Sequence, residues 1–326
     1  MLCIIPLPKG LFFCYNSSHM NFIQFLRIVE IRTKIVSVST LALGFLWTWV
    51  TRGTIEWPLA VLMILATLMV DMGTTAFNTF YDFTNGVDAK ETNREADKVL
   101  VHQNVAPGWA LVVSLGLYGG AGILGLIITF LTGPWVLLVG ILSFAVGFFY
   151  NGGPRPLSST PLGEIFAGGF LGGVLFLLVI YTQTGALNLQ DFLMAVPSTF
   201  FIASILTVNN TCDAVGDKRA GRFTLSILLG PKLSSLLIPL EGIVAYLSGA
   251  TALALMAPAT SGLQDILLSQ SPLILAAGFS VPGYLAMQNR GYSHETKGPN
   301  MGGISQLFLI FTLGMVGALI TQGILF

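Results

Sequence analysis

The sequence comprises 326 residues, of which 54% are hydrophobic and only 9% are charged. Soluble domains carry about 25% charged residues, so this chain has too little polar surface to cover a water-exposed globule of its size. Its formal net charge of +0 lacks the basic excess of nucleic-acid-binding proteins, which argues against a nucleic-acid partner. The 3 cysteines and 3 histidines are scattered and show no metal-binding spacing. We therefore expect the chain to lie in a lipid bilayer.

Residues 1–19 show no clear pattern of apolar and polar positions. A secretory signal would need a longer apolar core, so we expect either a disordered tail or a true start at Met20. The more regular stretch from Asn21 to Lys34 is predicted to be an amphipathic helix at the membrane surface. Residues 20–326 are expected to form a single transmembrane domain.

Long apolar segments fill the rest of the chain. A helix needs about 20 apolar residues to cross the hydrocarbon core of a bilayer. Nine segments qualify, at residues 35–51, 57–80, 108–131, 134–151, 163–183, 192–211, 233–256, 267–287 and 303–325. Glycine pairs such as Gly168-Gly169 and Gly172-Gly173 suit close contact between such helices. The sequence thus predicts an all-α membrane protein with about nine transmembrane helices in a bundle.

Basic residues are unevenly distributed among the loops that join these segments. If nine spans alternate in direction, the basic residues before the first span and after the second, fourth, sixth and eighth spans share one side of the membrane. The opposite side holds only Arg52. Basic loops face the cytosol in membrane proteins, so we expect this side, together with the N-terminus, to be cytosolic.

The first acidic motif lies at the expected cytosolic end of the second span. Asn78 and Asp82 are four residues apart and therefore share one face of a helix. Asp88 would leave that face in a continuous helix, but Gly86 permits a turn that brings it back. The motif is expected to gather oxygen ligands at one point.

A second acidic motif lies at the end of the sixth span. Asn209, Asp213 and Asp217 follow one another at intervals of four residues and form one helical stripe. The Asn-x₃-Asp pattern thus occurs twice, at the ends of helices four spans apart, as in a duplicated helical bundle. A single copy is often only a solvated helix end, whereas two copies on one membrane face indicate a functional site.

Carboxylates that converge at a membrane surface repel each other unless hard cations lie between them. Mg²⁺ prefers oxygen ligands and usually binds one or two carboxylates together with substrate phosphates. The predicted metal ligands are Asn78, Asp82, Asp88, Asn209, Asp213 and Asp217. Basic side chains nearby would meet the remaining phosphate charge. The candidates are Arg94, Lys98, Arg155, Lys218 and Arg222.

A third motif, Tyr150–Ser158, follows the fourth span. Its glycines and prolines predict an irregular loop on the same membrane face, and Arg155 is its one charge. Arg155, Lys218 and Arg222 are also consistent with roles as membrane anchors. Glu164, at the start of the next span, is a candidate for binding an acceptor hydroxyl or for favouring the helix N-terminus.

Two acidic residues lie within predicted spans, where charges are costly and point to function. Asp71 lies seven residues before Asn78, on roughly the same helix face, and is a candidate for lining a substrate cavity or orienting an acceptor. Glu241 belongs to no motif, so a buried, hydrogen-bonded role is expected for it.

These motifs resemble those of the UbiA superfamily of intramembrane prenyltransferases. The Asn78–Asp88 motif is similar to the Asn-x₃-Asp-x₃-Gly-x-Asp variant of its 1,4-dihydroxy-2-naphthoate polyprenyltransferases, the menaquinone branch. The stretches Tyr150–Leu157, Gly163–Phe166 and Asp213–Leu225 resemble that branch as well. The resemblance covers the chain from about residue 21 to its end.

The resemblance implies a bundle around a central cavity, in a bacterial cell membrane, with the site facing the cytoplasm. It implies transfer of a polyprenyl group from its Mg²⁺-bound diphosphate to an aromatic acceptor. In the menaquinone branch this acceptor loses its carboxylate and gives a demethylmenaquinone. The residues implied in catalysis are Asp82, Asp88, Asp213, Asp217 and Arg155. Those implied in binding are Asn78, Asn209, Arg94, Lys98, Tyr150, Lys218 and Arg222.

Other functions share some of these features. A secondary transporter would also be a helical bundle with internal repeats, but its site would lie near the bilayer midplane rather than at helix ends. Within the enzyme class, other aromatic compounds, haem and glycerophosphate lipids are alternative acceptors. The position of the acidic motifs at helix ends favours the prenyltransferase.

Overall fold

The computed structural model describes residues 3–6, 12–14, 20–88, 98–103 and 105–326. Within those ranges, 9 helical segments are long and apolar enough to cross a membrane, which confirms the predicted all-α membrane bundle. They are Ile31–Arg52, Trp57–Thr84, Pro107–Thr132, Pro134–Asn151, Gly163–Thr184, Leu189–Arg219, Leu225–Met256, Leu263–Arg290 and Lys297–Leu325.

Two of these spans are assembled from shorter pieces. The first joins the 3₁₀ turn η1 (Ile31–Lys34) to α2 (Ile35–Arg52). The fifth joins α7 (Gly163–Ala167), the π-helical turn η3 (Gly168–Val174) and α8 (Leu175–Thr184). The other spans are α3 (Trp57–Thr84), α5 (Pro107–Thr132), α6 (Pro134–Asn151), α9 (Leu189–Arg219), α10 (Leu225–Met256), α11 (Leu263–Arg290) and α12 (Lys297–Leu325). Shorter helices are α1 (Phe22–Ile28), α4 (Val99–His102) and η2 (Leu157–Ser159).

Two short strands precede the bundle. β1 (Cys3–Pro6) and β2 (Phe12–Cys14) pair in antiparallel fashion. They fall in the stretch for which we expect either a tail or a true start at Met20, and that expectation stays a prediction.

The predicted amphipathic helix over Asn21–Lys34 is interrupted. α1 ends at Ile28, and the chain enters η1 only after Glu30, whose backbone takes a left-handed conformation with φ 47°. The hydroxyls of Thr75 and Thr79 on α3 donate hydrogen bonds, at 2.9 and 3.1 Å, to the two carbonyl groups that precede Glu30. Because these carbonyls bond to α3, they do not continue the helix, and the prediction of one continuous helix was wrong.

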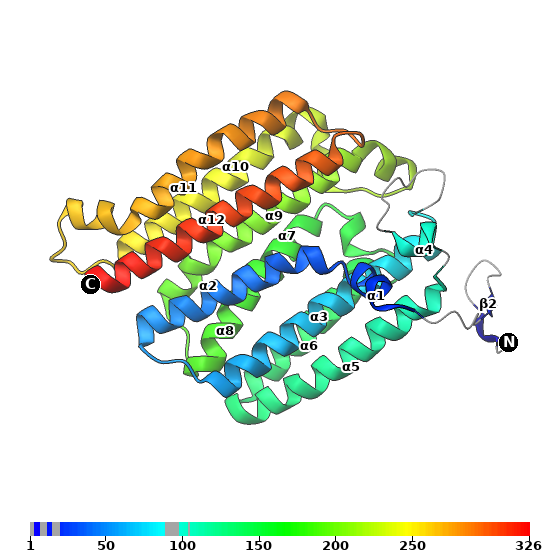
Figure 1. Ribbon diagram of the computed structural model, residues 1–326, viewed down its shortest axis with the longest axis horizontal. Coiled ribbons are helices and arrows are strands. Elements are labelled where there is room, and N and C mark those ends of the chain that lie inside the picture. Colours follow the sequence, from blue (N-terminus) through cyan, green and yellow to red (C-terminus); the bar gives the residue numbers. More distant parts are fainter. Residues whose placement is uncertain (1–2, 7–11, 15–19, 89–97, 104) are drawn as a thin grey trace.

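The helices form two groups (Figure 1). One group contains α9, α10, α11 and α12, the other contains α3, α5 and α6, and α2 lies between them. The largest hydrophobic cluster packs α2 and α8 against the first group, with Trp47, Phe201 and Phe311 fully buried. A separate cluster packs α2 and α8 against α3, α5 and α6. α2 therefore ties the two groups together through different faces.

Glycines allow η3 to approach α9 closely. A Cβ atom added at Gly172 would lie 2.5 Å from the backbone nitrogen of Thr199, and one at Gly168 would collide with the carbonyl oxygen of the same residue. A Cβ atom at Gly169 would meet nothing within 4 Å. A Cβ atom at Gly173 would lie 3.0 Å from the Thr199 hydroxyl oxygen, so the predicted role in helix packing holds for Gly168, Gly172 and Gly173 but not for Gly169. This contact also fixes the start of α7 beside α9.

α3, α6, α9 and α11 all finish at the same end of the bundle, which we call the motif end. It lies toward α1 and α4, on the right in Figure 1, whereas the C-terminus lies at the opposite end. The short helix α4 and the loop after α6 belong to the motif end as well. Both acidic motifs and the third motif are therefore brought to one end of the molecule.

Candidate functional site

The first acidic motif forms the end of α3. Asn78 and Asp82 lie on its last two turns, and the helix ends at Thr84. Gly86 takes a φ of 76°, a left-handed conformation that glycine adopts without strain. The chain turns back there, and the Asp88 amide donates a hydrogen bond to the Asp82 carbonyl at 3.0 Å. The two carboxyl groups act electrostatically on each other, so the turn predicted at Gly86 brings them together as expected.

Lys98 links this motif to the N-terminal segment. Its ammonium nitrogen lies 3.4 Å from a carboxylate oxygen of Asp88 and 3.2 Å from one of Glu30. The charges of Lys98 and Glu30 both act on Asp82. Lys98, one of the predicted basic residues, therefore lies beside the first acidic motif. Glu30 adds a third carboxylate, which the spacing of the motif does not reveal.

The second acidic motif forms the end of α9. Asp217 is buried and pairs with Arg222, with 3.0 Å between carboxylate oxygen and guanidinium nitrogen. α9 ends at Arg219, and Gly221 then reverses the chain with a φ of 78°. The Arg222 amide donates a hydrogen bond to the Asp217 carbonyl at 2.9 Å. A left-handed glycine thus follows each acidic helix end and returns a charged residue toward it.

Asp213, one turn before Asp217, is bound by the segment between α11 and α12. The ammonium nitrogen of Lys297 lies 2.8 Å from one carboxylate oxygen, and Nδ1 of His294 lies 3.3 Å from the other. Burial raises the pKa of Tyr292, on the same segment, to about 12, so its hydroxyl is neutral at physiological pH. Sequence reasoning missed both basic partners, because neither belongs to a motif. The sequence indicates only that both residues lie between the predicted eighth and ninth spans, on the side of the membrane where the basic residues gather.

The third motif lies against the second. Arg222 donates a hydrogen bond through Nη2 to the Ser158 carbonyl at 3.2 Å. The hydroxyl of Tyr150 is buried within electrostatic range of Glu164 and Arg222. Glu164 is itself buried, and one of its oxygens accepts a hydrogen bond from Asn210 at 2.8 Å. Asn210, next to a predicted metal ligand but on a different face of α9, was also missed from the sequence.

Arg222 connects all three motifs. Besides pairing with Asp217 and bonding to the Ser158 carbonyl, it places a positive charge that acts on Asp82 of α3. Asp82 and Asp217 come from different helix groups, and both lie at the motif end of the bundle. Such an arrangement suits a substrate with several negative charges.

Other predicted residues are not brought into these contacts. Arg155 and Lys218 are exposed, and neither makes an ion pair with an acidic residue in the described part of the chain. Arg94 lies outside the described residues. Asn78 and Asn209 are half-buried on the helix faces that carry the aspartates. The functional roles expected for these residues stay predictions.

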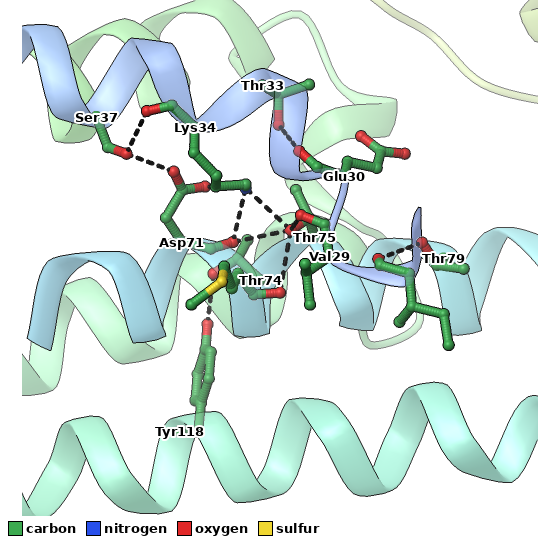
Figure 2. A network of polar contacts seen from close by, with 12 residues as sticks. Val29, Glu30, Thr33, Lys34, Ser37, Asp71, Thr74, Thr75, Thr79 and Tyr118 are labelled. Carbon is green, nitrogen blue, oxygen red and sulfur yellow. Dashed lines mark hydrogen bonds and ion pairs between the residues drawn. The ribbon is translucent and has the colours of Figure 1, made fainter. Parts of the chain in front are cut away.

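The two acidic residues within spans have partners in the bundle. Asp71 forms a buried ion pair with Lys34 at 2.6 Å, which joins α3 to the start of α2 (Figure 2). Ser37 donates a hydrogen bond to the second oxygen of Asp71 at 2.7 Å, and Lys34 also donates to Thr75 at 3.0 Å. Both oxygens of Asp71 are thus engaged in holding helices together. Glu241 accepts a hydrogen bond from a threonine of α9 at 3.1 Å, as its predicted buried role requires.

The oxygen ligands fit Mg²⁺ as two carboxylate pairs. The chain turn at Gly86 returns Asp88 to the helix end that carries Asp82, and Asp213 and Asp217 lie one turn apart on α9. Among the side chains that the structure describes, no three His, Cys, Asp or Glu residues lie close enough to hold a metal ion by themselves. Mg²⁺ commonly takes one or two protein carboxylates and completes its coordination with water and substrate phosphates. These residues therefore fit a metal that binds together with a diphosphate.

Comparison with known proteins shows which family and which relatives the sequence is similar to. The model of the UbiA prenyltransferase family matches residues 37–299. The 1,4-dihydroxy-2-naphthoate octaprenyltransferase of Bacillus subtilis is 35% identical over 185 residues, which are 57% of this chain and 59% of that protein. The UbiA prenyltransferase domain-containing protein 1 of Danio rerio is 30% identical over 214 residues, 65% of this chain and 62% of that protein. The chain thus spans about six tenths of the length of these relatives.

The fold is similar to that of a solved structure, a UbiA homologue from Archaeoglobus fulgidus bound to DMAPP and Mg²⁺. The similarity covers 91% of this chain and 98% of that one, with a TM-score of 0.62 and 16% sequence identity. At this identity the likeness shows the helical fold alone. The family model, however, matches well over half of the sequence, and the chain therefore belongs to the UbiA prenyltransferase family.

Proposed function

We propose that the chain transfers a polyprenyl group from a polyprenyl diphosphate to 1,4-dihydroxy-2-naphthoate, as a step of menaquinone biosynthesis. Family membership supports the reaction class. The Bacillus subtilis relative, which is named as a 1,4-dihydroxy-2-naphthoate octaprenyltransferase, supports the aromatic acceptor. The acidic motifs at the motif end support the diphosphate.

One observation carries this proposal: both acidic motifs lie at the motif end, and each has a basic partner there, Lys98 at Asp88 and Arg222 at Asp217. Carboxylates alone would repel a diphosphate. Arg222 and Lys297 at the second motif, with Lys98 at the first, give the site the mixed charge that a metal-bound diphosphate needs. A transporter site near the bilayer midplane would not need this arrangement at helix ends.

The side chains have distinct roles in this proposal. The Mg²⁺ ligands would be Asn78, Asp82, Asp88, Asn209, Asp213 and Asp217. When bound, Mg²⁺ supplies positive charge that stabilises the departing diphosphate. Arg222 and Lys98 would bind phosphate oxygens, for which the planar guanidinium of arginine is well suited. The Archaeoglobus fulgidus homologue, solved with DMAPP and Mg²⁺, supports the choice of metal.

The surroundings of the site would protect the transfer step. The bond between the prenyl carbon and the diphosphate oxygen would break, and the diphosphate would leave with the electron pair. The electron-rich ring would form a new bond to that carbon and then lose its carboxylate as CO₂, which restores the aromatic ring. Apolar helices next to the motif end would hold the prenyl chain and keep water from that carbon. Glu164 has one oxygen fixed by Asn210, so its second oxygen is in a defined position to orient a hydroxyl of the acceptor.

We place the motif end at the cytoplasmic face of a bacterial cell membrane. The basic residues of the described bundle lie at this end, with Arg52 at the other. Basic loops remain on the cytoplasmic side during membrane insertion, which supports this orientation.

The proposal is tested by incubating purified protein with Mg²⁺, a polyprenyl diphosphate and a panel of aromatic acids, with products identified by mass spectrometry. We expect a prenylated and decarboxylated product from 1,4-dihydroxy-2-naphthoate and none from 4-hydroxybenzoate. A product from a different acceptor alone, such as haem or a glycerophosphate lipid, would overturn the acceptor. Lack of any product, combined with substrate uptake by proteoliposomes, would favour a transporter.

A further inference from the structure

Glu30 combines an unfavourable backbone conformation with a charge beside the candidate site. Its φ of 47° and ψ of 60° lie in the left-handed region, which non-glycine residues rarely adopt. Such strain concentrates at functional positions, where the surrounding structure enforces it. The Glu30 carboxylate lies 3.2 Å from the ammonium nitrogen of Lys98.

Contacts on both sides of Glu30 enforce this conformation (Figure 2). The two carbonyl groups before it accept hydrogen bonds from Thr79 and Thr75 of α3. After it, Lys34 is held on the same helix by its buried ion pair with Asp71. Because both flanks are anchored to α3, the turn between them has to be made at Glu30. The Glu30 side chain therefore extends toward Lys98 at the motif end.

Lys98 is shared between two acids. It lies 3.2 Å from Glu30 and 3.4 Å from Asp88, and only 14% of its side chain is exposed. The negative charge of Glu30 acts on Asp82 as well. Glu30 therefore occupies the position from which it competes with any other anion that approaches the first motif.

We propose that Glu30 is a positioning residue that holds Lys98 until the substrate diphosphate takes its place. The inference rests on the proposed function, in which Lys98 binds phosphate oxygens. A carboxylate bound to Lys98 opposes diphosphate binding, because the diphosphate has to displace it. The same competition favours release of the product pyrophosphate, so Glu30 lowers affinity and speeds turnover.

Glu30→Gln tests this role, because it removes the charge and preserves the size of the side chain. In purified full chain with Mg²⁺, we expect inorganic pyrophosphate to bind about fivefold more tightly than to the wild type, the scale expected for loss of a partly exposed ion pair. The ligand-dependent rise of the thermal unfolding midpoint measures this affinity. KM for geranyl diphosphate and kcat should both fall. A purely structural role would lower the unfolding midpoint and leave the affinity unchanged.

A double-mutant cycle with Lys98→Met tests whether Glu30 acts through Lys98. In that background, Glu30→Gln should change pyrophosphate affinity by less than about twofold. A fivefold gain there would show that Glu30 acts by direct repulsion, and would overturn the positioning role. Glu30→Gly removes the charge and also the backbone strain, so it provides the same test if the glutamine variant folds poorly.

Glu56→Gln is the matched control, because Glu56 is an exposed glutamate at the opposite end of the bundle. It should leave pyrophosphate affinity and KM unchanged. Equal or weaker binding by Glu30→Gln would overturn the inference, and a raised Mg²⁺ requirement would make Glu30 a metal ligand instead. If the wild type transfers no prenyl group from geranyl diphosphate or from any longer polyprenyl diphosphate, the proposed function is at fault, while the pyrophosphate titration still decides the role of Glu30.

Discussion

Arg222 joins segments that are far apart in the chain. Its Nη1 bonds to Asp217 at 3.0 Å and its Nη2 to the Ser158 carbonyl at 3.2 Å, so two separate nitrogens are in use. Its charge also acts on Asp82 of α3. A lysine carries a single ammonium group and cannot reproduce this planar fork.

Arg222→Lys should therefore lower kcat/KM for prenyl transfer about tenfold to hundredfold, as expected for loss of hydrogen bonds to charged groups. The measurement is a steady-state assay in membranes with equal amounts of each protein. Arg219→Lys is the control, since Arg219 is a neighbouring exposed arginine at the end of α9. Equal activity of both variants would remove Arg222 from the centre of the site.

The residues of the two acidic motifs could be predicted because their spacing alone places them. Intervals of four put Asn209, Asp213 and Asp217 on one helix face whatever the rest of the chain does. The partners of Asp213 could not be predicted in this way. His294 and Lys297 lie some eighty residues later, in the turn before α12 and at its first residue, and they reach Asp213 through packing of α11 and α12 that no local pattern encodes.

The close contact between η3 and α9 depends on glycines, which have no side chain to separate the two backbones. A Cβ atom at Gly172 would lie 2.5 Å from the backbone of Thr199, whereas Gly169 in the same turn faces open space. Gly172→Ala should lower the stability of the bundle by about 1–3 kcal/mol through overpacking. Thermal unfolding in detergent measures this loss, and Gly169→Ala is the matched control. Equal stability of the two variants would contradict the packing account.

The ion pair between Lys34 and Asp71 is a second link between elements, here α2 and α3. The side chain of Lys34 is 5% exposed and that of Asp71 is 11% exposed, so Lys34→Met leaves a largely desolvated carboxylate without its cation and should cost about 3–5 kcal/mol. Replacing both residues, as Lys34→Met with Asp71→Leu, should recover most of that stability. Chemical unfolding of the purified variants provides the comparison. A double variant no more stable than the single one would show that the pair contributes little.

Element boundaries differ in how far the sequence determines them. Apolar length predicted all nine spans, because the bilayer imposes that length on each helix separately. The break at Glu30 escaped prediction, since it depends on hydroxyls of Thr75 and Thr79 that come from another helix. The π-helical turn η3 escaped for the same reason, because it lies where two glycines meet α9.

The distribution of charge over the molecule predicts its orientation in the membrane, with the motif end on the cytoplasmic side. Arg155 is exposed at the motif end, and Thr54 is exposed in the loop between α2 and α3 at the opposite end. With Cys3 and Cys14 replaced by serine, the remaining Cys212 is buried. A membrane-impermeant maleimide should then label Arg155→Cys only in inside-out vesicles and Thr54→Cys only in right-side-out vesicles. The reverse pattern would place the motif end outside.

We propose that the aspartates of α3 and α9 act together in one Mg²⁺-dependent site. Its most direct test is prenyl transfer by purified wild type, Asp82→Ala, Asp213→Ala and the double variant, each with Mg²⁺ and with EDTA. We predict that each single variant loses at least about a hundredfold in kcat, that the double variant is little worse, and that EDTA abolishes wild-type turnover until Mg²⁺ is restored. Full activity in either single variant, or turnover that persists in EDTA, would contradict the account.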